Sequence, residues 1–101
     1  MKLTMADVKR INRDNGKCFF EKGMMKFFNS RIGNTLYGNK YFVTSEKFDE
    51  NSPRLYTIRL FDVNTGSVDT VGEFQGFKTG QQAISHIKGL LKEGEWWILL
   101  K

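Results

Sequence analysis

The side chains best suited to catalysis in this 101-residue chain are one histidine and one cysteine, and neither belongs to a catalytic pattern. His86 has no second histidine and no cysteine at the spacing of a metal site. It lies beside the apolar stripe of a predicted helix, so we expect it on the helix surface. Cys18 is flanked by Phe19 and Phe20 and is expected to be a small buried hydrophobic residue, because a nucleophile would need an activated thiolate and an orienting group. A single cysteine also excludes an internal disulfide.

Three carboxylates, Asp62, Asp69 and Glu73, surround the turn of a predicted hairpin. Acid–base catalysis by paired carboxylates needs at least one of them in an apolar pocket. Asp62 instead suits the turn, where its side chain accepts backbone N–H groups. We expect Asp69 and Glu73 to face solvent, opposite Arg59 or Arg54 across the hairpin. The sequence therefore predicts no enzyme, no metal site and no cofactor.

The mixture of basic and aromatic residues in the first half of the chain gives a better indication of function. The net charge is +5, and residues 1–47 carry ten Lys or Arg against four acids, whereas residues 48–101 carry six against seven. Nucleic-acid-binding proteins combine cations that neutralise phosphates with rings that stack on bases. The same surface would attract an acidic protein. The candidate binding residues are Lys22, Lys26, Arg31, Tyr37, Lys40, Lys47, Arg54 and Arg59.

The elements that position these side chains begin with a short helix. Thr4 is a good N-cap, and Asp7 stands three residues later in the capping-box position. Asn15-Gly16 supplies the left-handed turn that commonly ends a helix.

The next segment, residues 17–28, is rich in paired aromatics and predicts two short strands about Gly23. A helix over residues 21–28 is the alternative, since a glycine weakens a helix without excluding it. Residues 29–39 are typical of a loop. Residues 40–47 predict a further strand.

A hairpin over residues 54–74, turning at Asn64-Thr65-Gly66, is the clearest local pattern in the chain. Alternation places Thr57 and Arg59 on one face. It places three apolar residues on the other face: Tyr56, Ile58 and Leu60.

The last helix is expected to begin at Thr79, with Gln82 completing a capping box, and to end at Gly94. The apolar tail over residues 95–101 is then expected to add a final strand. Alternatively, it forms the seam of a homodimer through Trp96, Trp97 and Leu99.

These elements predict one α+β domain spanning residues 1–101. We expect an antiparallel sheet of about four to six strands, with an N-terminal helix and a C-terminal helix packed mainly on one of its faces. No apolar run approaches the roughly 20 residues that a membrane span needs, and no secretory signal opens the chain. Together with the lone cysteine, this favours the cytoplasm.

Part of the hairpin resembles a known DNA-binding design. The segments at 56–66 and 71–74, followed by the helix start at Thr79, are similar to three-stranded domains of the integrase arm-binding and plant ethylene-response types. The resemblance implies that an exposed sheet face enters the major groove through Arg54, Thr57, Arg59 and Lys47. Negative charge on the same hairpin and a longer link at 75–78 depart from that pattern.

A second resemblance covers nearly the whole chain. Segments 25–32, 37–46, 54–59 and 69–75 are similar to a family of small proteins from bacteriophages, prophages and other mobile elements. That family has no assigned activity, so the resemblance implies a context in a bacterial host cell rather than a mechanism. It draws attention to polar residues of the first half, namely Asn29, Arg31, Tyr37, Thr44 and Ser45.

The sequence thus predicts a small, non-enzymatic accessory protein of phage type whose basic N-terminal half binds nucleic acid. The alternative is an inhibitor of a host protein, or an anti-defence factor, that uses the same residues against an acidic protein surface.

Overall fold

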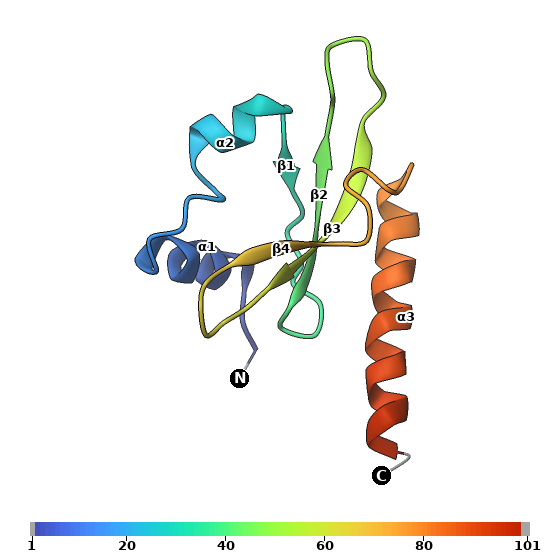
Figure 1. Ribbon diagram of the computed structural model, residues 1–101. Coiled ribbons are helices and arrows are strands. Elements are labelled where there is room, and N and C mark those ends of the chain that lie inside the picture. The colour runs from blue at the N-terminus through green and yellow to red at the C-terminus, as the bar shows by residue number, and fades with distance from the viewer. Residues whose placement is uncertain (1, 100–101) are drawn as a thin grey trace.

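A computed structural model describes residues 2–99 of the chain, with side chains described for residues 2–93 (Figure 1). Four strands form one antiparallel sheet in the order β1-β2-β3-β4, and three helices accompany it. The elements are α1 (Met5–Asp14), α2 (Lys22–Phe27), β1 (Arg31–Ile32), β2 (Tyr41–Glu46), β3 (Leu55–Phe61), β4 (Val68–Val71) and α3 (Gly80–Leu99). The predicted α+β architecture is confirmed: along the chain, one helix precedes the strands of an antiparallel sheet and another follows them.

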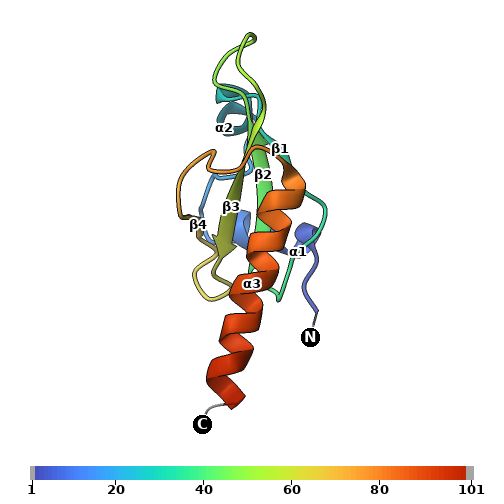
Figure 2. The ribbon, with the colours of Figure 1, turned by 90° about the vertical axis from the view of Figure 1, so that its right-hand side faces the viewer.

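The two terminal helices cover opposite faces of the sheet, which corrects the expectation that they share one face. Figures 1 and 2 show α3 on one side and α1 and α2 on the other. The reason lies in β2, where neighbouring residues point to opposite faces and each face carries a buried apolar side chain. Phe42 is fully buried on the α1 side and Val43 is buried on the α3 side. Each face therefore needs its own cover.

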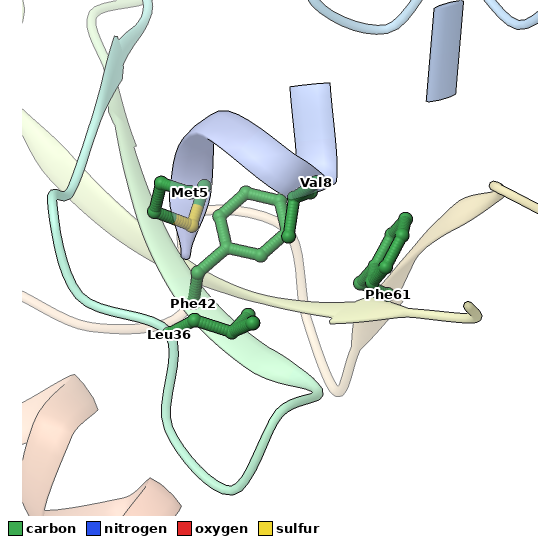
Figure 3. Close-up of a cluster of buried hydrophobic side chains, with 5 residues drawn as sticks. All are labelled: Met5, Val8, Leu36, Phe42 and Phe61. Carbon is green, nitrogen blue, oxygen red and sulfur yellow. The ribbon is translucent and has the colours of Figure 1, made fainter. Parts of the chain in front are cut away.

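The cluster on the α1 side joins the N-terminal helix to the sheet. Its buried members are Met5, Val8, Leu36, Phe42 and Phe61 (Figure 3). The predicted capping box starts the helix: Asp7 N donates to Thr4 Oγ1 over 3.2 Å, and Thr4 N donates to Asp7 Oδ2 over 2.9 Å. The hydrogen bond from the Thr4 backbone lowers the pKa of Asp7. A buried amide, Asn12, donates to the carbonyl of Gly66 over 2.7 Å and ties α1 to the β3–β4 turn.

The cluster on the α3 side is built by the predicted stripe of the last helix. Ala83 and Ile87 are fully buried against Val43 and Ile58. Gln82 N donates to Thr79 Oγ1 over 3.1 Å, but Gln82 Oε1 accepts from Lys78 N rather than from Thr79 N, so only half of the predicted capping box is formed. The turn before β2 approaches this helix closely: at Gly38 (φ +59°) an added Cβ would lie 2.5 Å from Leu91 Cδ2. Any larger residue there would have to displace the Leu91 side chain, and glycine suits the left-handed conformation.

The aromatic segment 17–28 contains no strand, and the two strands predicted about Gly23 are wrong. The alternative helix is present as α2. Phe19 and Phe20 pack on Phe42, with ring centroids 6.3 and 6.0 Å away, above the sheet rather than at its edge. The edge position is taken instead by β1, which pairs with β2 inside the segment predicted as loop.

The C-terminal tail is helical as far as the structure describes it. α3 runs past Gly94 to Leu99, so both the predicted helix end and the predicted final strand are wrong. One glycine costs a helix only about 1 kcal/mol, and the flanking residues favour its continuation. The side chains of Trp96, Trp97 and Leu99 lie outside the described residues. No helix in the described part of the chain is long and apolar enough to span a bilayer.

Ile87→Ala should destabilise the protein by about 2–5 kcal/mol, because it removes a fully buried side chain that anchors α3 to the sheet. Urea unfolding followed by circular dichroism measures this loss. Ser85→Ala, at an exposed position of the same helix, is the control and should change the free energy of unfolding by less than about 0.5 kcal/mol. Equal effects of the two substitutions would contradict the packing described.

The homodimer through the tail stays a prediction. If that seam exists, Trp97→Glu should convert a dimer to a monomer while the circular dichroism spectrum is unchanged, because a charge is not accommodated in an apolar seam. Light scattering coupled to gel filtration measures the mass. A wild-type protein that is monomeric at high concentration would exclude the seam.

Candidate binding site: an apolar groove over a buried ion pair

A groove lies between α2 and the part of the sheet face that α1 leaves uncovered. Its volume is about 420 Å³. Its walls are apolar and come from three segments: Phe19, Met24, Met25, Phe27, Phe28 and Phe74. Its floor is polar and comes from β2 and β3, through Thr44, Glu46 and Arg59. We refer to these walls and this floor as the groove.

The groove exists because α2 is too short to bury its own apolar side chains. It is a six-residue helix without a side-chain cap, and none of its residues is buried. Met24 is 53% exposed and Phe27 is 77% exposed. Both side chains therefore stand at the mouth of the groove, accessible to solvent.

Phe28, which follows α2, organises the aromatic wall. Its ring centroid lies 4.6 Å from that of Phe27, 5.5 Å from that of Phe74 and 6.2 Å from that of Phe48. These separations are those of favourable aromatic pairs. The Phe28 ring thus packs against rings from α2, from the loop after β2 and from the segment after β4.

The segment after β4 carries Phe74 across the sheet. Gly72 turns the chain with φ +73°, in the left-handed region where glycine costs nothing. Beyond it, Gln75 N donates to Thr57 Oγ1 over 2.8 Å, and Gln75 Nε2 donates to the Glu46 carbonyl over 2.9 Å. These bonds hold Phe74 at the edge of the groove, where it is 42% exposed.

The floor of the groove is an ion pair between neighbouring strands. Arg59 Nη2 lies 3.8 Å from Glu46 Oε2, and the two side chains are 12% and 1% exposed. Burial of two charges is costly unless they are paired and hydrogen-bonded. The surrounding polar side chains therefore determine whether the pair is tolerated.

The guanidinium of Arg59 is well provided with partners. Nε donates to Thr44 Oγ1 over 3.0 Å, and Nη1 donates to Thr70 Oγ1 over 2.6 Å. Its carbon lies 5.3 Å from the ring centroid of Phe19 and 5.5 Å from that of Phe74, within the range of cation–π attraction. Burial lowers the pKa of Arg59, and the Glu46 carboxylate opposes that shift.

The carboxylate of Glu46 is only half satisfied. Oε1 accepts a hydrogen bond from Thr57 Oγ1 over 2.7 Å. Oε2 is buried and accepts no hydrogen bond from any residue that the structure describes. The groove therefore combines apolar walls with an acceptor at its floor.

The predicted binding residues do not form one surface. Arg59 lies in the floor, and Arg54 donates to the carbonyls of Asn29 and Ser45 and to the Ser45 hydroxyl, so both serve the fold. Tyr37 packs on the α3 side.

Arg31 and Lys40 are exposed and line neither the groove nor the depression beside it, and the ammonium of Lys40 lies 5.3 Å from the Tyr41 ring. Lys22 and Lys26, by contrast, stand on α2, and Lys26 and Lys47 line a depression beside the groove with Phe27 and Phe48. Three of the eight candidates thus flank the groove.

Several single-residue predictions are settled. Asp62 accepts from Asn64 N over 2.8 Å, so its turn role is confirmed, and His86 is exposed on α3 as predicted. The burial predicted for Cys18 is wrong, because the thiol is exposed. Asp69 and Glu73 are exposed as predicted, but Arg59 pairs with Glu46, and Arg54 donates to Asn29 and Ser45 rather than to either carboxylate. Among the described residues, no group of three or more His, Cys, Asp and Glu side chains is suitably placed to hold a metal ion.

Comparison with protein families matches residues 4–88 to DUF7447, described as a family of unknown function. The chain belongs to this family. The DUF7447 match includes α1, the whole sheet and every residue of the groove. Comparison with curated proteins gives no match, and comparison with solved structures gives none.

Arg59→Met should lower the free energy of unfolding by about 3–5 kcal/mol, because it leaves the Glu46 carboxylate buried without a counter-charge. The double variant Glu46→Met/Arg59→Met should recover most of that loss, since it removes both charges. Urea unfolding measures both, and Lys88→Met at an exposed site is the control. A double variant as unstable as the single variant would show that charge burial is not the dominant cost.

Proposed function

We propose that this chain is a non-enzymatic binding protein whose groove docks an acidic, amphipathic segment of another protein. The observation that carries the proposal is the cluster of exposed apolar side chains around the groove. Phe27, Phe48 and Met24 are 77, 70 and 53% exposed, and they adjoin one another across the groove and its neighbouring depression. Contiguous exposed apolar surface of this kind marks interaction sites.

The charges beside the groove support an acidic partner. α2 carries Lys22 and Lys26 and no acidic residue in its first turn, and Lys47 borders the adjoining depression. Asp49 and Glu50 also line that depression. Asp49 accepts hydrogen bonds from Asn51 N and the Ser52 hydroxyl and so serves its own turn, which leaves Glu50 as the acid that opposes these lysines. The net charge of +5 adds long-range attraction for an acidic surface.

An amphipathic helix is the partner element that suits a groove with apolar walls and lysines beside it. Helices bind in apolar grooves through side chains spaced three or four residues apart, with polar residues left at the rim. Two methionines in the wall favour this mode, because their flexible thioether side chains adapt to different apolar shapes.

Nucleic-acid binding is the second candidate. Phe27 and Phe48 are exposed beside Lys26 and Lys47, a combination that suits base stacking and phosphate contact. It is less favoured because Arg54 and Arg59 make internal contacts, which leaves few cations beside the exposed rings.

The similarity to small proteins of phages and mobile elements favours a bacterial host protein as the partner. In that setting the chain would act in the host cytoplasm as an inhibitor or anti-defence factor, by occupying a surface rather than by catalysis.

Fluorescence anisotropy with three labelled probes separates the candidates. The probes are an amphipathic helical peptide of leucine and glutamate, the same peptide with lysine in place of glutamate, and a single-stranded oligothymidylate. The acidic peptide should bind best. Met24→Asp should weaken this binding by at least about tenfold, because it puts a charge in place of an exposed apolar contact of the groove wall.

Val63→Asp is the matched control, since Val63 is 48% exposed but lies outside the groove, and it should leave peptide binding unchanged. If the oligothymidylate binds more tightly than the acidic peptide, with affinity that falls steeply with salt, the nucleic-acid candidate replaces the one proposed. If Met24→Asp and Val63→Asp have the same effect, the groove is not the binding surface.

A further inference from the structure

The floor of the groove holds a hydrogen-bond acceptor without a donor, the Oε2 atom of Glu46, and this atom limits which chemical groups a ligand can favourably place there. Glu46 is 1% exposed, and its Oε2 accepts no hydrogen bond among the described residues although the side chain lines the groove. A buried acceptor without a donor costs free energy comparable to a lost hydrogen bond. A ligand that brings a donor to this oxygen would recover that cost on binding.

On the basis of the function proposed above, we infer that the groove receives one anchoring side chain from its partner, the indole of a tryptophan. The indole ring would lie among the phenylalanine and methionine side chains of the wall. Its N–H would donate to the carboxylate of Glu46. Tryptophan suits such a site because it joins a large apolar body to a single donor, and it is enriched at the energetic centres of interfaces.

A neutral donor fits the electrostatics of the floor better than a cation does. Arg59 already lies 3.8 Å from Glu46 Oε2, so the pair carries no net charge. An ammonium or guanidinium from a partner would bury a third, uncompensated charge, which is strongly unfavourable. An indole N–H supplies the missing hydrogen bond without adding charge.

The size and lining of the groove favour an aromatic ring over an aliphatic side chain. A closed apolar cavity of roughly 150 Å³ accepts benzene, and the groove, although open, has a volume of about 420 Å³. Phe27, Phe28 and Phe74 offer ring faces and edges for offset or edge-to-face contact.

Access to the oxygen requires a small rearrangement within the groove, because Oε2 itself is buried. Met24 and Met25 line the same groove, and three rotatable side-chain bonds allow each to move aside at low cost.

The test compares indole with 1-methylindole as probes of the isotope-labelled protein by two-dimensional amide NMR. The two rings have nearly the same apolar surface, but only indole carries an N–H. Indole should bind at least about 10-fold more tightly, as one hydrogen bond to a charged acceptor provides. Shifted amides should map to α2 and to the ends of β2 and β3 that form the groove. Met24→Asp should weaken the binding of both rings, and Val63→Asp should weaken neither.

Three outcomes would overturn the inference alone and leave the proposed docking function standing. Equal affinity for the two rings would show that the donor is irrelevant. Shifts outside the groove would place the ring elsewhere. Binding of the acidic peptide without binding of either ring would leave the docking function standing and remove the indole anchor. If neither peptide nor ring binds, both proposals fail.

Discussion

A buried ion pair on the α1 side of the sheet determines how the rest of that face is used. The cluster around Phe42 and Phe61 covers one part of the face with apolar packing. The other part holds Glu46 and Arg59, whose charges exclude a continuous apolar cover and require polar neighbours from three strands. The chain therefore places rings at the edges of this region and only a short helix above it. The groove is the space that results.

Local patterns were sufficient to predict much of the fold. The capping box at Thr4, the capping residue Thr79 and the hairpin with its alternating faces all depend on residues a few positions apart, and each is present as predicted. The errors concern segments whose structure depends on distant partners. Residues 17–28 have strand-like composition, but β1 takes the position beside β2, and the rings of Phe19 and Phe20 pack on Phe42 instead.

The site was harder to predict than the fold, because charge alone does not tell a surface cation from a buried one. The sequence predicts Arg59 as a binding residue, whereas its partner Glu46 lies on the neighbouring strand and is brought close only by the register of β2 and β3. A signal for that partner was present in the sequence. Glu46 shares the alternation of Phe42 and Thr44, so a strand buried on both faces places a carboxylate in the interior.

The strand order β1-β2-β3-β4 has a consequence for how the chain folds. Every strand pairs with its neighbour in sequence, so the sheet forms by successive short loop closures, which cost little entropy and favour rapid assembly. The N-terminal helix is the exception. Its buried Asn12 bonds to a carbonyl 54 residues further along the chain. During synthesis on the ribosome, α1 therefore emerges before the sheet on which it packs, and the Asn12 amide meets its acceptor only after the β3–β4 turn has followed.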